Sequence, residues 1–220
     1  MKLLAVSDVE IGFLYSPMIR DRYQDVDLIL SCGDLPYYYI EYMVSMLNVP
    51  CYFVRGNHAS DREFGAGGII RRFPWGAVDL HHRCVEDDTG LLMAGLEGSL
   101  RYNRGTHQYT QSEYWSMVLS FVPRFLYNKA RLGRYLDVFI SHAPPWQIHD
   151  ADDLPHRGIK AFRWLINVFQ PTYFLHGHIH VYRQDTVTRS MIGKTIVQNV
   201  FGYKVLTIPT PEIRSWQRRR

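Results

Sequence analysis

Five short polar motifs carry the residue types that bind metal ions in proteins. They contain Asp8 and Glu10, Asp34, Asn57 and His58, His142, and His178 and His180. Carboxylates, imidazoles and amide carbonyls are the ligands that hold divalent ions such as Mn, Fe and Zn. One such residue alone is more often a hydrogen-bonded loop residue. Five motifs of this kind in one chain favour a metal site.

Each motif follows a short run of branched or aromatic residues. The runs are residues 3–6, 28–30, 52–54, 138–140 and 173–175. Runs of this length and composition predict buried strands. Gly33, Gly56 and Gly177 stand beside the polar residues and permit sharp turns and close approach of the backbone. The polar motifs are therefore expected in loops at the strand ends.

The order of the elements predicts an α/β (α+β) fold. Helical patterns at 38–47 and 158–169 alternate with strands, which places functional residues beyond the carboxyl ends of the strands. The last third instead indicates antiparallel strands, and the middle of the chain indicates others. These are expected at 186–189, 195–199 and 204–208, and at 78–80, 83–86 and 91–94. Together the patterns predict two mixed sheets with helices outside.

The five motifs, taken in order, resemble those of the calcineurin-like metallophosphoesterases, including bacterial metal-dependent phosphoesterases. The family pattern is DxH, GD, GNH, a distal His and GHxH. Here it reads Asp8-Val9-Glu10, Gly33-Asp34, Gly56-Asn57-His58, Ser141-His142-Ala143-Pro144 and Gly177-His178-Ile179-His180. The resemblance covers about residues 1–208 and implies a four-layer αββα sandwich, with two mixed β-sheets flanked by helices. We expect one such domain over 1–220, with a basic, aromatic, helical insertion at about 101–133.

The resemblance also implies a binuclear metal site. Asp8, Glu10, Asp34 and His180 would hold the first ion, and Asp34, Asn57, His142 and His178 the second. Two such ions lower the pKa of a bridging water. The expected activity is hydrolysis of a small phosphodiester or a phosphomonoester by a metal-bridging hydroxide. His58 would assist the leaving group by protonating it.

Two positions depart from the family pattern. Glu10 stands where a histidine is usual, and a carboxylate is a harder donor that favours Mn or Fe, with Zn possible. In the alternative interpretation Glu10 leaves the first site weak, and the chain is a metal-poor, non-catalytic binding scaffold. Ala59 stands where many relatives carry an acidic residue, which makes Asp61 the candidate to orient His58.

The charge distribution favours an anionic substrate. The chain has 25 basic and 21 acidic residues, a net charge of +4, and its basic residues gather at 101–134 and 214–220. Basic segments near an active site attract anions, although a solvated helix face is the alternative and the terminal Arg218-Arg219-Arg220 is better explained as a frayed tail. Arg101 and Asn103 are candidates to contact the substrate. The sequence lacks a recognisable nucleic-acid-binding module or a regular basic stripe, so no specific nucleic-acid partner is expected. Loops 64–75, 101–134 and 148–157 are expected to set specificity.

Three cysteines without CxxC spacing indicate reduced thiols and a cytoplasmic protein. No run approaches the roughly 20 apolar residues of a membrane span, so no membrane partner is expected. The sequence Tyr37-Tyr38-Tyr39 lies just after Asp34 and either stacks on a substrate ring or packs in the core. The sequence indicates no particular oligomeric state.

Overall fold

The computed structural model describes residues 1–60 and 62–210 and contains two large mixed sheets. The first has the strand order β15 (Gly202–Thr207), β1 (Lys2–Ser7), β2 (Leu28–Ser31), β3 (Cys51–Phe53) and β6 (Ala77–Asp79). The second has the order β13 (Arg189–Ile192), β14 (Thr195–Asn199), β12 (Tyr173–His176), β11 (Val138–Ser141), β8 (Leu92–Leu96) and β7 (Arg83–Glu86). The central strands of both sheets are parallel, and the antiparallel strands lie at the edges.

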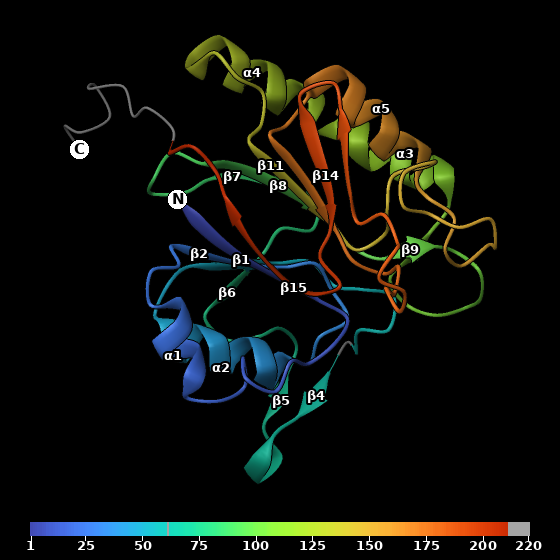
Figure 1. The fold of residues 1–220 in the computed structure, drawn as a ribbon. Coiled ribbons are helices and arrows are strands. Elements are labelled where there is room, and N and C mark those ends of the chain that lie inside the picture. The colour runs from blue at the N-terminus through green and yellow to red at the C-terminus, as the bar shows by residue number, and fades with distance from the viewer. Residues whose placement is uncertain (61, 211–220) are drawn as a thin grey trace.

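Helices cover the outer face of each sheet (Figure 1). On one side lie α1 (Met18–Tyr23) and α2 (Tyr37–Leu47), and on the other lie α3 (Gln111–Ser120), α4 (Val122–Leu132) and α5 (Lys160–Phe169). Two small ladders, β4 (Glu63–Phe64) with β5 (Ile70–Arg71) and β9 (Ser99–Leu100) with β10 (Gln108–Tyr109), complete the strands, and η1 (Ala66–Gly68) is a short turn of 3-10 helix. This arrangement confirms the four-layer αββα sandwich.

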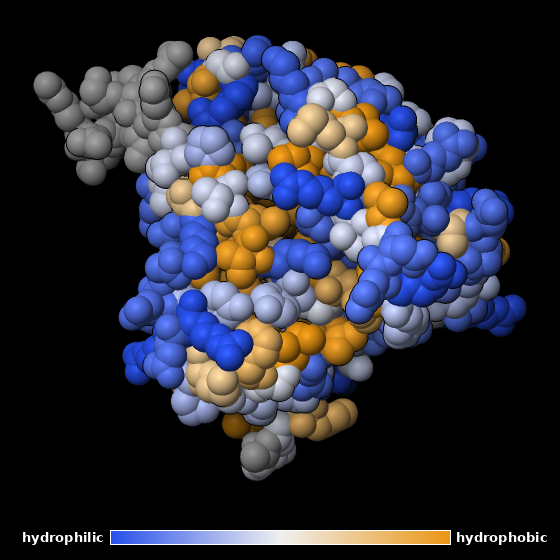
Figure 2. All heavy atoms as spheres, viewed as in Figure 1, coloured by the Kyte–Doolittle hydropathy of each residue, from blue (hydrophilic) through white to orange (hydrophobic). Residues whose placement is uncertain are grey.

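Strand β1 shows how the sequence makes these layers. Successive side chains of a strand point to opposite faces, and in β1 both faces are buried. Leu3 and Ala5 pack between the two sheets, whereas Leu4 and Val6 pack against the side covered by α1 and α2. A continuous apolar run is therefore what this position requires. In Figure 2 apolar residues gather across the middle of the visible face, with hydrophilic side chains above and below them.

The predicted elements are largely present. The five strands that precede the polar motifs are confirmed, and so are the two predicted helices, which the structure places at α2 and α5. The strand expected at 186–189 is wrong, because β13 spans Arg189–Ile192. Gly193, at φ 58°, and Lys194 make the turn that sets Ile192 opposite Thr195, and this pairing carries the strand beyond the predicted range.

The segment predicted as a helical insertion contains β10, α3 and α4. A capping box at Thr110 and Glu113 begins α3. Phe121 and Phe125 are buried in the core between the second sheet and its helices. Asp61 and the basic residues of 214–220 lie outside the described residues. Within the described part of the chain, no helix is both long and apolar enough to span a bilayer.

Candidate metal centre

The carboxyl ends of β1, β2, β3, β11 and β12 bring the polar motifs to one edge of the two sheets. The backbone N–H of Asp8 donates to the Gly33 carbonyl at 3.1 Å, and that of Gly177 donates to the His142 carbonyl at 3.0 Å. Asp8, Asp34 and His178 have φ values of 67°, 55° and 68°. This left-handed region is costly for residues other than glycine and is often occupied at functional sites.

The imidazole of His142 is the point on which four motifs converge. Its Nε2 lies 3.0 Å from Asp34 Oδ2, 3.1 Å from Asn57 Oδ1 and 3.1 Å from His178 Nδ1. His142 is completely buried. One ligand atom from each of His142, Asp8 and Asp34 can be chosen so that all three atoms lie within 4.8 Å of one another. Residues up to 170 positions apart thus present carboxylate, amide and imidazole donors to one small volume.

Backbone carbonyls determine which nitrogen of each imidazole faces this volume. A carbonyl only accepts, so Cys32 O, 2.8 Å from His142 Nδ1, requires a proton on that nitrogen. In the same way Pro155 O, 2.8 Å from His178 Nε2, leaves His178 Nδ1 as an acceptor toward the cluster. Such outer hydrogen bonds orient histidines that bind metals. His142 Nε2 and His178 Nδ1 are therefore the nitrogens available to an ion.

The electrostatics of the cluster favour a positive charge at its centre. Burial lowers the pKa of His142, but the Asp34 carboxylate outweighs burial and raises this pKa to about 9. Burial likewise raises the pKa of Asp34, and His142 overcomes that effect and lowers it to about 2. The pKa of His178 falls to about 3 because of burial and the neighbouring His142. A proton on His142 Nε2 thus occupies the place that these donors offer to a cation.

Glycines leave no room for side chains beside the carboxylates. A Cβ at Gly56 would overlap the Asp34 carboxylate, and one at Gly177 would lie 2.6 Å from Asp8 Oδ2. The Asp8 carboxylate accepts from the His178 backbone N–H, and His180 Nε2 lies 3.9 Å from Asp8 Oδ1. The donor set and this close packing fit an ion between Asp34, Asn57, His142 and His178, and a second near Asp8 and His180.

Glu10, two residues after Asp8, is exposed and is bonded to Tyr38. The Tyr38 hydroxyl donates to Glu10 Oε2 at 2.7 Å, and this bond to a carboxylate raises the pKa of Tyr38 to about 12. Tyr37 and Tyr39 are buried, so packing accounts for two of the three consecutive tyrosines. A carboxylate has about four acceptor sites on its two oxygens, so the bond from Tyr38 leaves Glu10 with further sites to act as a ligand.

We expect Tyr38→Phe to lower the affinity for the first Mn ion by about tenfold, the usual cost of losing a hydrogen bond to a metal ligand. Glu10→Ala should lower it further, and Tyr15→Phe, beside Tyr38 on the same surface, should leave it unchanged. Calorimetric titration of chelator-treated protein with Mn measures all three. If neither Tyr38→Phe nor Glu10→Ala changes the affinity, Glu10 is not a ligand.

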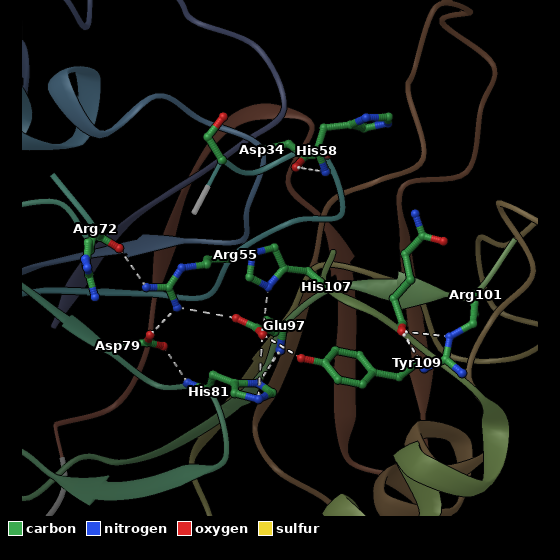
Figure 3. Close-up of polar contacts among 12 residues, drawn as sticks. Asp34, Arg55, His58, Arg72, Asp79, His81, Glu97, Arg101, His107 and Tyr109 are labelled. Atoms are coloured by element: carbon green, nitrogen blue, oxygen red, sulfur yellow. Dashed lines mark hydrogen bonds and ion pairs between the residues drawn. The ribbon is translucent and has the colours of Figure 1, made fainter. Parts of the chain in front are cut away.

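His58 is attached to the cluster through its backbone. Its N–H donates to Asp34 Oδ1 at 2.9 Å, and the residue lines a cavity of about 210 Å³ together with Asp34, Pro36 and Glu63. Figure 3 shows the imidazole extending away from the neighbouring polar network. The side chain is exposed and available to a ligand in that cavity.

The candidate substrate residues Arg101 and Asn103 make contacts with their own loop and with the first turn of α3. Arg101 pairs with Glu113 at 3.1 Å, and Asn103 Oδ1 accepts from Gly105 N at 2.7 Å. Between them lies Tyr102, whose hydroxyl accepts from Asn57 Nδ2 at 3.0 Å. This bond directs the Asn57 carbonyl oxygen toward His142. The motif spacing gives no signal for Tyr102, because the two residues meet only in the folded chain.

A buried carboxylate supports the loop that carries Asn57 and His58 (Figure 3). Glu97 is 4% exposed and accepts from His107 Nδ1 at 2.9 Å and from the Tyr109 hydroxyl at 2.7 Å. Burial raises the pKa of Glu97, but the bond from His107 and its other partners lower it to about 2. The Glu97 carboxylate also forms an ion pair with Arg55, at 3.5 Å. Arg55 directly precedes Gly56-Asn57-His58, so this pair ties the carboxylate to the start of that loop.

Two imidazoles support the loop that carries His178 and His180. His176 Nδ1 donates to the Gly177 carbonyl at 3.0 Å, so its Nε2 accepts from His149 Nδ1 at 3.0 Å. His149 Nε2 then accepts from the Ser190 hydroxyl at 2.9 Å. This directional chain requires both imidazoles to be neutral. Burial lowers the pKa of His149 to about 4 and that of His176 to about 3.

The neutral imidazoles should make the protein sensitive to acid. Because the pKa of His149 is lower in the folded chain, the unfolded chain binds more protons below about pH 6.5, and stability falls as the pH falls toward about 4. His149→Gln keeps an amide donor toward His176 but does not titrate. Between pH 7 and pH 5 the free energy of unfolding should fall in both proteins. The fall should be about 1–2 kcal/mol smaller in His149→Gln than in wild type. Urea unfolding of metal-free protein measures this, and equal losses would contradict it.

Comparison with known proteins places this site in a family. The sequence profile of the calcineurin-like phosphoesterases matches residues 1–182. The chain belongs to the calcineurin-like phosphoesterase family. This membership supports a phosphoesterase function in general, and the family generally depends on two metal ions. No curated protein matches the chain.

Solved structures show the same fold as this calcineurin-like phosphoesterase. TT1561 of Thermus thermophilus superposes with a TM-score of 0.61 at 15% identity, over 93% of each chain. A second structure gives 0.62 at 15% identity over 93% of this chain and 94% of that one. Vps29 of Cryptosporidium parvum gives 0.42 at 12% identity over 90% and 72%. At these identities the first two structures confirm the fold alone.

Proposed function

We propose that this calcineurin-like phosphoesterase is an active, metal-dependent hydrolase of a phosphodiester or a phosphomonoester. The observation that carries the proposal is the convergence of Asp34 Oδ2, Asn57 Oδ1 and His178 Nδ1 on His142 Nε2, each at 3.0–3.1 Å. Polar groups that are costly to bury are brought together here. A binding scaffold would have no need to retain the whole set.

Two divalent ions would occupy this centre, Mn or Fe by the hardness of the donors, with Zn as the other choice. Asp8, Glu10, Asp34 and His180 would hold the first ion, and Asp34, Asn57, His142 and His178 the second. When bound, such ions supply charge neutralisation at the phosphate oxygens and an ionised water at neutral pH.

The role of His58 follows from its position. Its backbone N–H donates to Asp34 Oδ1, the residue lines the adjoining cavity, and its side chain is exposed. The oxygen that leaves phosphorus carries developing negative charge and needs a proton, which a positioned imidazole can donate near neutral pH. His58 would therefore protonate the leaving oxygen. Arg101 and Asn103 would contribute to substrate binding through their loop.

The three cysteines support a cytoplasmic location, because none forms a disulfide in the described residues.

The proposed activity is tested by hydrolysis of bis-4-nitrophenyl phosphate by chelator-stripped protein to which Mn is returned. Turnover that requires Mn would support the enzyme. An inert protein that also binds no metal would support the non-catalytic scaffold instead.

A further inference from the structure

Two cavities adjoin the candidate metal centre. The first, of about 210 Å³, is lined by His58 and Asp34. The second, of about 380 Å³, is lined by Ala151, His156, Ile179, His180 and Tyr182. Asp34 belongs to the same cluster as Asp8, and His180 Nε2 lies 3.9 Å from Asp8 Oδ1. A phosphorus atom at the centre therefore has two separate cavities next to it.

The second cavity has an aromatic wall. Tyr182 is 82% exposed, so its ring is accessible to a ligand. Its position is nevertheless defined, because its hydroxyl lies 2.8 Å from His180 Nδ1 and its ring centroid lies 6.0 Å from that of Phe201. The His180 ring lies 4.9 Å from Phe201. The exposed ring of Tyr182, which His180 and Phe201 contact, therefore offers a face on which a planar ligand can stack.

The lining of this cavity also includes an oriented histidine. His156 Nδ1 bonds to Asp153 Oδ2 at 2.6 Å, and its ring lies 5.2 Å from that of His178. The lining residues of the cavity include no Lys, Arg, Asp or Glu among the described residues. Such a lining does not offer a second anionic group a fixed positive partner. An uncharged substituent fits it better than another phosphate does.

The volume of the second cavity distinguishes between ester classes. A phosphomonoester has one organic substituent, which would occupy the His58 cavity as the leaving group and leave the larger cavity empty. A phosphodiester has two, and about 380 Å³ lies within the range of pockets that hold small organic groups.

We propose that the substrate is a phosphodiester, an inference that rests on the proposed function. Its retained substituent is an uncharged planar group of nucleoside size that stacks on Tyr182. The leaving group occupies the His58 cavity. Hydroxide, formed when a water molecule gives up a proton to solvent, supplies the oxygen of the new bond to phosphorus. The bond from phosphorus to the leaving oxygen breaks as that oxygen takes a proton from His58, which regains a proton from solvent. The retained group leaves as a phosphomonoester.

Two esters with the same leaving group test this proposal. Thymidine 5′-(4-nitrophenyl phosphate) carries a planar base, methyl 4-nitrophenyl phosphate carries none, and both release 4-nitrophenol. Because base stacking on an aromatic residue changes binding by about tenfold or more, we expect kcat/KM with Mn to be about tenfold higher for the thymidine ester. The difference should lie mainly in KM.

Variants of Tyr182 separate its ring from its hydroxyl. Tyr182→Phe removes the contact with His180 but keeps the ring, and Tyr182→Ala removes both. The ratio of the two kcat/KM values cancels any change at the metal centre. It should remain about tenfold in Tyr182→Phe and fall to about one in Tyr182→Ala. Tyr127→Ala, an exposed tyrosine on α4, should behave as wild type.

A binding measurement gives a second readout that does not depend on turnover. In saturation-transfer NMR with chelator-treated protein, the base protons of thymidine should receive magnetisation from wild type and Tyr182→Phe but not from Tyr182→Ala. Equal kcat/KM values for the two esters in wild type, or a ratio that persists in Tyr182→Ala, would overturn the proposal. So would faster cleavage of 4-nitrophenyl phosphate than of either diester. If wild type cleaves none of the three, the proposed function itself has failed.

Discussion

Asp34→Asn should lower the hydrolysis of bis-4-nitrophenyl phosphate by about a thousandfold or more. This corresponds to several kcal/mol of lost transition-state stabilisation, the contribution expected of bound ions. Asp34 is the only residue placed in both proposed ligand sets. Its Oδ2 lies 3.0 Å from His142 Nε2, and its Oδ1 accepts from the His58 backbone N–H at 2.9 Å. An amide keeps the shape of the side chain but loses its charge and one acceptor.

The same substitution should lower the number of Mn ions bound per chain while the circular dichroism spectrum stays that of wild type. Asp21→Asn, an exposed aspartate on α1, is the matched control and should retain full activity and metal content. An Asp34→Asn protein that keeps more than a tenth of the wild-type rate would show that Asp34 does not bridge the ions.

His58→Ala should give the second largest effect, and its size should depend on the leaving group. Loss of a positioned general acid typically costs 10²–10⁴-fold. That full cost should appear with an alkyl leaving group, which departs as a strongly basic alkoxide. With 4-nitrophenol, whose anion is stable near neutral pH, the cost should be about tenfold or less. Steady-state kcat for the two kinds of diester measures the difference.

Metal content should not change in His58→Ala, because the contact of His58 with Asp34 is made by the backbone. His82→Ala is the matched control, since His82 is exposed and bonds to Ser120 on α3. A loss of the same size for both leaving groups would assign His58 a part in binding the phosphate rather than in proton transfer.

Much of the fold follows from local sequence. In β1 the run Leu3–Val6 is apolar at every position because both faces of the strand are buried, and such runs are visible without a structure. The ends of these runs also locate the polar motifs, since parallel strands place their carboxyl ends at one edge. The bounds of β13 do not follow from composition, because the turn at Gly193 sets where its pairing begins and ends.

The contacts that orient the candidate ligands follow from tertiary structure and leave no local pattern. Tyr38 and Glu10 are 28 residues apart, and Tyr102 and Asn57 are 45 apart. Tyr182 is close to His180 in sequence, but its exposure depends on how the loop lies over Phe201. Residue types at strand ends thus predict which groups would bind an ion. Only the fold shows which neighbours hold them.

Titration of metal-free protein with Mn, followed by both calorimetry and turnover of bis-4-nitrophenyl phosphate, tests the central claim most directly. We expect two ions per chain and activity that rises with their binding, because the donors form two sets that share Asp34. A protein that binds no Mn, or one whose hydrolysis persists unchanged in excess chelator, would contradict the assignment of this centre as a metal-dependent phosphoesterase site.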